Sequence, residues 1–330
     1  IIKKNKKNIV MIKKQLLVIL ATIVLSFSAF AQNFGGGNGT QNDPYLIKTK
    51  AQFLAIRNNL SACYKQTADI DLGDLGTLAD NTAIINGTFS GTYDGGGKSI
   101  SYSVKFFGNV EKESFGLFEK VSGTIKNLRI TSSSAMLTGK GADMNVGLIC
   151  GVLLSGGVIT DCHVTGDINS TVNPGEGAGS DAGLIAGQSL GKIKYSSGTG
   201  NVVGVGYAGG LVGQLNDRWG HYSSGTTNGE IIGCSFVGSV TALKPSGNYN
   251  LNNDLGNFAG GICGLVYNGE ANPEISLSYA NATVVSDGGK AYGLAYFSNN
   301  NGTISNIYVK GTVNDDNIDI ENISIEEIDK

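Results

Sequence analysis

Arginine, histidine, proline and tryptophan are scarce in this 330-residue chain. It has two histidines, four prolines and one tryptophan, and its only arginines are Arg57, Arg129 and Arg218. No basic run occurs beyond residue 31. Because binding to phosphate backbones requires a cluster of positive charge, the sequence predicts no nucleic-acid partner.

A long hydrophobic run is also missing. The longest apolar segment, Leu16 to Phe27, has 12 residues, too few to cross a bilayer comfortably. Lys13 and Lys14 precede it and Ala29-Phe30-Ala31 follows, which is the order of a secretory signal peptide. We expect cleavage before Gln32, so residues 1–31 are left out of the fold, and the mature chain is expected to be secreted or on the cell surface, without a transmembrane segment.

Glycine and acidic residues are abundant instead. Residues 32–330 contain 18 Lys and Arg and 27 Asp and Glu, which gives a net charge of −9. Glycine occupies 50 of 330 positions, about twice the usual ~7% share. Since proline is rare and Ile, Val and Leu are frequent, this composition favours short strands joined by many turns over disorder or collagen.

Two phrases repeat along the chain. The first is Gly-Leu or Gly-Ile, as in "YAGGLVGQ" (207–214) and "FAGGICGL" (258–265). The second follows the first in six units at 123–130, 157–164, 191–198, 229–236, 273–280 and 302–309. Repetition in a fixed order with variable spacing indicates a repeat architecture whose insertions fall between the phrases.

The second phrase reads as a half-buried strand. Aligned on its isoleucine, residues three, four and five positions later alternate between inward, outward and inward types, as in Cys162, His163 and Val164. One unit buries too few apolar side chains to fold alone, whereas stacked units share a core. We therefore predict an all-β parallel β-helix, in which the repeated glycines turn corners with positive φ and let the coils stack closely.

The phrases "GGLVGQ", "GGICGL" and "GLICGV" resemble the GLUG motif of bacterial surface proteins. The resemblance extends over roughly Gly36 to Gly311. It implies a right-handed parallel β-helix, exported and adhesin-like, with no established catalytic residues to carry over.

The organisation follows from these patterns. Residues 32–83 are predicted to form a small N-terminal α/β cap with a short helix over Thr49 to Leu60, where Phe53, Ile56 and Leu60 have helical spacing. Residues 84–313 are the predicted β-helix. Residues 314–330 are an acidic C-terminal tail or cap.

Two insertions are the predicted ligand surface. "NDRWGHYSSGTTN" interrupts the fourth unit, and "ALKPSGNYNLNNDLGN" (242–257) follows it. Long loops on a rigid scaffold commonly carry binding residues, so the candidate residues are Arg218, Trp219, His221, Tyr222 and Tyr249. The alternative is that Trp219 folds back and packs against the flank of the solenoid.

Other chemistry-bearing residues have simpler interpretations. Cys150, Cys162, Cys234 and Cys263 fall in small-residue columns and are expected to fill the core, since Ser196 separates Cys162 from Cys234. His163 is expected to face solvent. Asp69 and Asp71 share a strand face that could attract calcium, but a solvated edge is favoured, so no metal and no cofactor are predicted.

The most consistent function is a non-catalytic, adhesin-like surface protein that binds a glycan or another host or cell-surface ligand. Alternatives are a polysaccharide lyase or glycosidase on the same scaffold and a passive structural spacer. A glycosidase needs two carboxylates at a defined separation, and no such constellation is visible in the sequence. Fold alone does not decide among these, and the sequence does not predict an oligomeric state.

Overall fold

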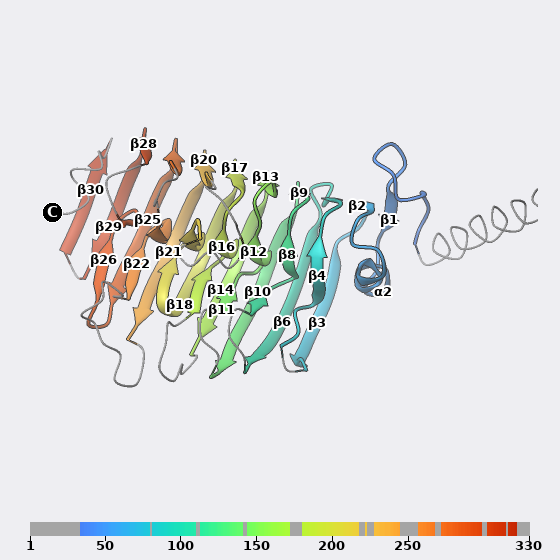
Figure 1. Cartoon of the computed structure of the whole chain (residues 1–330), viewed down its shortest axis with the longest axis horizontal. Helices are drawn as coiled ribbons and strands as arrows, with labels where there is room; N and C mark the ends of the chain where they lie inside the picture. Colours follow the sequence, from blue (N-terminus) through green and yellow to red (C-terminus); the bar gives the residue numbers. More distant parts are fainter. Residues whose placement is uncertain are drawn as a thin grey trace, which may run out of the picture.

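The computed structural model describes residues 34–321 except 80, 110–112, 141–143, 172–179, 218–221, 223–227, 245–256, 268–271, 299–301 and 315, and the backbone alone for 317–321. The predicted signal peptide and most of the predicted tail therefore lie outside the described residues. Strands dominate, and they follow one another along the long axis of the molecule (Figure 1).

Three sheets run the length of the described chain. Sheet 1 contains β1 (Tyr45–Ile47), β2 (Cys63–Gln66), β5 (Thr92–Asp94), β9 (Thr124–Lys126), β13 (Val158–Thr160), β17 (Lys192–Lys194), β20 (Glu230–Ile232), β24 (Glu274–Ser276) and β28 (Thr303–Ser305). Sheet 2 contains β3 (Ile70–Thr77), β6 (Ser99–Gly108), β10 (Arg129–Gly139), β14 (His163–Ser170), β18 (Ser197–Gly209), β21 (Ser235–Leu243), β25 (Tyr279–Ser286), β29 (Tyr308–Val313) and β30 (Asp316–Glu321). Sheet 3 contains β4 (Ile85–Phe89), β8 (Phe118–Val121), β12 (Cys150–Leu153), β16 (Ala186–Ser189), β19 (Val212–Leu215), β23 (Cys263–Val266) and β27 (Tyr296–Phe297).

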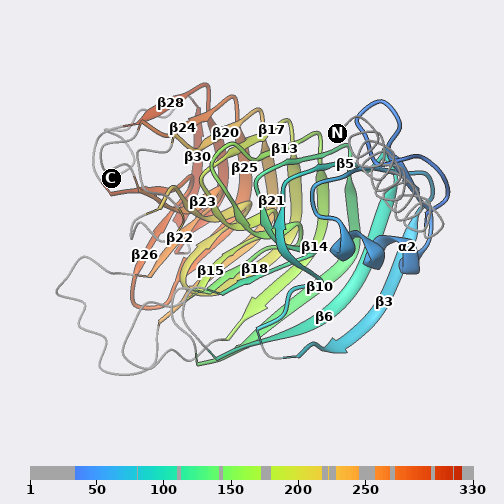
Figure 2. The same cartoon turned by 45° about the vertical axis from the view of Figure 1, so that its right-hand side comes forward.

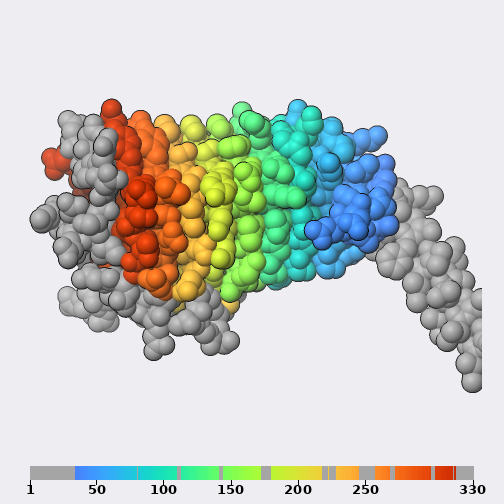
Figure 3. Space-filling model, turned by 90° about the horizontal axis from the view of Figure 1, so that it is seen from above, coloured from blue at the N-terminus to red at the C-terminus, as the bar shows by residue number. Residues whose placement is uncertain are grey.

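A further set of short strands, here called the side ladder, joins sheet 2 through the end of β18. It contains β7 (Ser114–Phe115), β11 (Met144–Val146), β15 (Ser180–Gly183), β22 (Phe258–Gly260) and β26 (Lys290–Tyr292). A complete coil passes through the side ladder, sheet 3, sheet 1 and sheet 2 in turn. Every strand pairs in parallel with its neighbours except β30, which is antiparallel to β29. This is a β-helix-like arrangement, and the coils lie as successive bands along the molecule (Figures 2 and 3).

The predicted stacking of the second phrase is confirmed in sheet 1. Ile159 pairs with Ile125 on one side and with Ile193 on the other. All three side chains are fully buried, and the corresponding isoleucines Ile231 and Ile275 continue the column. Adjacent coils therefore cover each other's apolar side chains, which a single unit cannot do alone.

The predicted helix is also confirmed, in shorter form. α2 (Lys50–Leu54) continues into the 3-10 helix η1 (Ala55–Asn58). Thr49 caps α2 because its side chain accepts a hydrogen bond from the backbone N–H of Gln52. Phe53 is buried, with its ring against Tyr93 and Phe118 at centroid distances of 5.9 and 6.1 Å. Strands β1, β2 and β3 already belong to the sheets, so the sheets begin before residue 84.

The glycines of the first phrase let two strands approach each other closely, and they do not have positive φ. A Cβ on Gly213 would lie 2.4 Å from the backbone nitrogen of Ala182 and 2.6 Å from the carbonyl carbon of Asp181. Gly187 stands in the same relation to Val146, at 2.4 Å. Neither glycine has positive φ. The expectation of close stacking is right, whereas the expectation that these glycines turn corners with positive φ is wrong, because here they let sheet 3 press against the side ladder.

The positive-φ corner lies elsewhere, between each strand of sheet 1 from β9 onward and the next strand of sheet 2. It is occupied by Asn127, Asp161, Tyr195, Gly233, Leu277 and Asn306, with φ between 49 and 66°. This conformation costs an ordinary L-residue roughly 1–2 kcal/mol, whereas glycine, asparagine and aspartate tolerate it. Four of the six positions hold one of these tolerant residues.

Candidate ligand surface

Most of the predicted ligand surface lies outside the described residues. Arg218, Trp219, His221 and Tyr249 are the predicted site residues that belong to that part of the chain. Tyr222 is described and is partly buried. It is therefore the one predicted site residue whose surroundings can be stated.

Tyr222 contacts the side ladder two and three coils away from β19, the strand that precedes its loop. Its phenolic oxygen lies 3.4 Å from Ser114 Oγ and accepts a hydrogen bond from Asn145 Nδ2 at 3.2 Å. Ser114 and Asn145 are paired neighbours in β7 and β11. The backbone N–H of Tyr222 donates to Asp217 Oδ2 at 2.6 Å. Tyr222, a described residue of the insertion, thus lies against the side ladder.

Asn216 fixes the base of the same insertion. Its side-chain oxygen accepts from the backbone N–H of Gly229 at 2.7 Å, and its Nδ2 donates to the Tyr267 carbonyl at 3.0 Å. The buried amides of Gln188 and Gln214 both donate to the Asn216 backbone carbonyl, at 3.0 and 2.9 Å. These bonds hold both ends of the loop against sheet 3.

Pairing in the side ladder aligns a column of side chains that runs from polar to aromatic. The column contains Ser114, Asn145, Asp181, Tyr207, Phe258 and Lys290. Tyr207 and Phe258 form, with Leu265 of sheet 3, a small buried cluster separate from the main core, against which Tyr292 and Tyr296 pack. We call the residues of this column and cluster the outer corner.

The aromatic rings of the outer corner are stacked along the molecular axis. Phe258 lies 5.6 Å from Tyr207 and 4.0 Å from Tyr296, measured between ring centroids, and both pairs are nearly parallel. The Lys290 ammonium stands 5.8 Å from the Tyr296 centroid, within cation–π range. Tyr292 and Tyr296 are partly exposed. The corner therefore combines aromatic faces, a cation, and amide and hydroxyl groups.

The other residues considered from the sequence lie as follows. Cys150, Cys162, Cys234 and Cys263 are buried thiols, as predicted, and burial raises the pKa of Cys162 to about 12 and that of Cys234 to about 11. Cys63, the fifth free cysteine, is partly exposed. His163 is exposed, as predicted, with Nδ1 2.8 Å from Ser197 Oγ.

Asp69 and Asp71 use their carboxylates within the chain. Asp69 accepts from the backbone N–H of Ser99, and Asp71 accepts from the backbone N–H of Gly73 and from Ser101 Oγ. These hydrogen bonds hold both pKa values below the usual range of an aspartate. Within the described ranges, no group of three His, Cys, Asp or Glu residues is placed to hold a metal ion.

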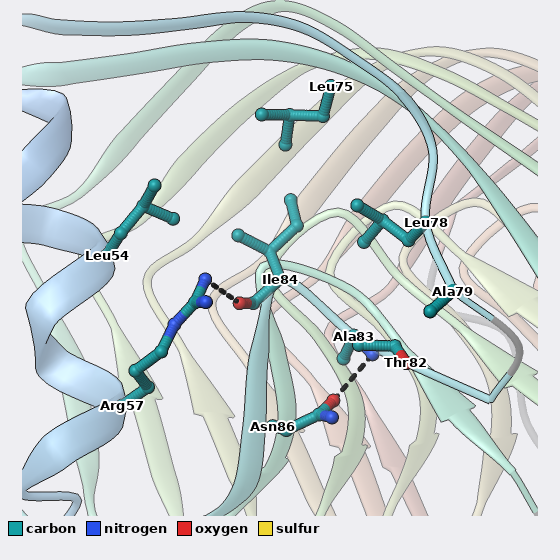
Figure 4. A pocket seen from close by; sticks show the side chains of 9 residues that line it. All are labelled: Leu54, Arg57, Leu75, Leu78, Ala79, Thr82, Ala83, Ile84 and Asn86. Atoms are coloured by element: carbon teal, nitrogen blue, oxygen red, sulfur yellow. Dashed lines mark hydrogen bonds between the residues drawn. The ribbon is translucent and has the colours of Figure 1, made fainter.

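A pocket of about 320 Å³ opens at the N-terminal end, between η1 and the β3–β4 connection (Figure 4). Its walls include Leu54, Leu75 and Ile84, which point toward one another. Arg57 is the one charged residue among its described lining and donates to the Ile84 carbonyl at 3.2 Å. The described lining of the pocket contains no carboxylate. In the described part of the chain no helix is long and apolar enough to cross a membrane.

Comparison with known proteins identifies the motif and the fold. The model of the GLUG motif matches residues 142–169, a segment that includes β11, β12 and β13. The chain is 34% identical over 182 residues to Halomucin from Haloquadratum walsbyi (strain DSM 16790 / HBSQ001). This match covers 54% of the chain and 2% of Halomucin. The chain thus spans a small fraction of that relative.

A solved structure has a similar fold. It is described as a "putative immunoglobulin A1 protease" from Bacteroides ovatus and superposes with a TM-score of 0.59. The match covers 86% of the chain and 81% of that structure at 23% sequence identity. At this identity the likeness concerns the fold alone.

Proposed function

Because this chain carries the GLUG motif on a β-helix-like fold, we propose that it is a non-catalytic, adhesin-like surface protein that binds a glycan. Export is supported by the signal-like order of residues 11–31, and surface location by the similarity to Halomucin. We also infer that the coils wind in the right-handed sense, since crossovers between parallel strands are right-handed in almost all proteins.

The observation that carries the proposal is the attachment of the Tyr222 loop to the outer corner. Arg218, Trp219 and His221 belong to the insertion whose two ends are joined by the hydrogen bond between Asn216 and Gly229, and Tyr222 within the same insertion contacts Ser114 and Asn145. A loop anchored in this way loses less conformational entropy when it binds a ligand. We assign the ligand surface to this loop, to Tyr249 in the neighbouring insertion and to the outer corner.

The chemistry of the outer corner suits a carbohydrate. The C–H face of a sugar ring is apolar and packs on aromatic rings such as Tyr292 and Tyr296, which are partly exposed. The Lys290 ammonium adds a site for an acidic sugar. Among the described residues of the outer corner, Asp181 is the one carboxylate, so the pair of acids that a glycosidase uses is not formed by them; we therefore propose a non-catalytic role.

A glycan array tests this proposal with residues 32–330 as the probe. We expect binding to a defined set of glycans that falls at least tenfold in Trp219→Ala. Tyr222→Phe, which removes the phenolic contacts with Ser114 and Asn145, should weaken binding by a smaller factor. The control is Thr283→Ala, a change at an exposed position of β25 in sheet 2.

Two outcomes contradict the proposal. Release of shortened or unsaturated sugars from polysaccharides would identify a glycosidase or lyase instead. Absence of binding to every glycan would favour a structural spacer.

A further inference from the structure

The corner between sheets 1 and 2 contains a second feature that packing alone does not explain. Its column of positive-φ positions is occupied by Asn127, Asp161, Gly233 and Asn306, which tolerate this backbone, and by two residues that do not, Tyr195 and Leu277. Both of these side chains are 58% exposed, so neither recovers the strain through burial in the core. Strain retained at an exposed position is a reason to look for a function.

Few large apolar residues are exposed in the described part of the chain. They are Tyr195, Val237 and Leu277. They come from three successive coils, because β17, β20 and β24 are consecutive strands of sheet 1 and Val237 follows β20. Tyr195 is the one aromatic residue among them, and its exposure leaves the ring accessible to a ligand.

The edge of the Tyr195 ring lies against the backbone of the next coil. A Cβ on Gly233 would lie 2.7 Å from Cδ1 and 3.0 Å from Cε1 of the Tyr195 ring but 3.9 Å from Cγ, so this glycine is beside the edge of the ring and not beneath a ring face. Gly233 is the one glycine among the six corner positions, and a residue with a side chain there would displace the ring. The backbone N–H of Tyr195 also donates to the Ile232 carbonyl at 2.9 Å. With the ring edge against Gly233 and 58% of the residue exposed, Tyr195 has a ring face open to solvent.

The groups near the ring are polar and charged. Glu230 bridges Lys192 and Lys194, with N–O distances of 2.6 and 3.1 Å, on the strands that lead into Tyr195 and Gly233. Ser197, two residues after Tyr195, lies 2.8 Å from His163 Nδ1. The site therefore has one flat apolar face surrounded by hydrogen-bond donors and acceptors.

We propose that Tyr195 is a stacking platform for a pyranose ring, a second carbohydrate site separate from the outer corner. The proposal rests on the proposed glycan-binding function. A sugar ring matches this arrangement because its C–H face covers the open face of Tyr195 while its hydroxyl groups reach the charged and hydroxyl groups at the edge. An extended apolar surface, as a protein partner requires, is not formed by one ring and two aliphatic side chains.

The test separates binding from stability, because the two effects of one substitution have opposite signs. Tyr195→Asn places a residue that tolerates positive φ at the corner, so it should raise the thermal midpoint by roughly 2–4 °C. It should also weaken carbohydrate binding at least tenfold. Leu277→Asn is the matched control: it relieves the same kind of backbone strain and should stabilise the protein equally, with binding retained.

Binding is measured as retardation of residues 32–330 in native gels containing mannan, xylan, galactan or mucin. Tyr195→Trp should preserve retardation, because it keeps an aromatic platform, and Gly233→Ala should reduce it by displacing the ring. Unchanged retardation of Tyr195→Asn, in a gel where Trp219→Ala loses it, would overturn the second site and leave the proposed function standing. Absence of retardation of the unchanged protein in all four gels would overturn both.

Discussion

At the scale of single residues, the absence of a methyl group at Gly213 lets two strands pack. The backbone nitrogen of Ala182, the carbonyl carbon of Asp181 and the carbonyl oxygen of Gly187 all lie within 2.7 Å of where a Cβ would be. Backbone atoms held by parallel pairing on both sides cannot move aside as a flexible side chain can. The glycines of the repeated phrase are thus required by space.

Substituting Gly213 with alanine tests this explanation. We expect Gly213→Ala to lower the free energy of unfolding by about 3 kcal/mol or more, as overpacking against an immobile neighbour does. Gly97→Ala is the control, because Gly97 has φ of 71° but nothing within 4 Å of a Cβ, so it should cost only the roughly 1–2 kcal/mol of positive φ. Equal losses in urea unfolding of the two variants would contradict a requirement for space.

At the scale of the element, α2 and η1 cover the N-terminal end of the core. Phe53 and Ile56 are fully buried there, and Phe53 reaches the rings of Tyr93 and Phe118 from the first coils. An open end of a stack of parallel strands otherwise presents unpaired edges to other chains. The helix therefore stabilises the protein by burying its apolar face, since a helix of five residues contributes little stability of its own.

Two substitutions distinguish these contributions. Phe53→Ala should lower the free energy of unfolding by about 3–5 kcal/mol, the typical loss for a buried phenylalanine. Thr49→Ala removes only the N-cap bond to the Gln52 N–H and should cost about 1 kcal/mol. Chemical denaturation followed by circular dichroism measures both. A larger loss of stability for Thr49→Ala than for Phe53→Ala would mean that the helix stabilises the protein through its own formation and not by covering the core.

The elements also show which parts of the structure a sequence can reveal. The strands of sheet 1 and the start of sheet 2 were predictable because one face is buried and one is solvated, as in β14, where burial alternates at every residue. The strands β12, β16, β19 and β23 are buried at every position. Because burial does not alternate along these strands, the sequence could not show which residues of the glycine-rich phrases belong to sheet 3 and which to the side ladder.

The candidate site was predictable only in part, for a related reason. The length of the 217–228 insertion pointed to Tyr222, but its partners Ser114 and Asn145 lie 108 and 77 residues away in sequence, and only the pairing of β7 with β11 brings them together. The corner column did carry a signal, since Asn127, Asp161, Gly233 and Asn306 all tolerate positive φ. Tyr195 and Leu277 obscured it.

At the scale of the whole molecule, stability should follow position along the axis. One continuous cluster of buried residues extends from Phe34 to Val309, yet each described strand pairs only with strands of the adjacent coils. In such quasi-one-dimensional proteins, local stability depends on each coil and its two interfaces. The central coils are the best packed: Ile159 and Ile193 are fully buried, whereas Ile304 in β28 is only partly buried and β26 has no fully buried residue.

Hydrogen exchange followed by mass spectrometry should resolve this gradient. We expect amides of β13, β17 and β20 to exchange slowest, at a rate approaching that of global unfolding, and amides of β26 and β28 to exchange first. Burial decides the order, because opening a coil that buries less apolar surface costs less free energy. Equal protection of β13 and β28 would mean that all the coils open together, so that the continuous core, and not the nearest-neighbour interfaces, sets the unit of cooperativity.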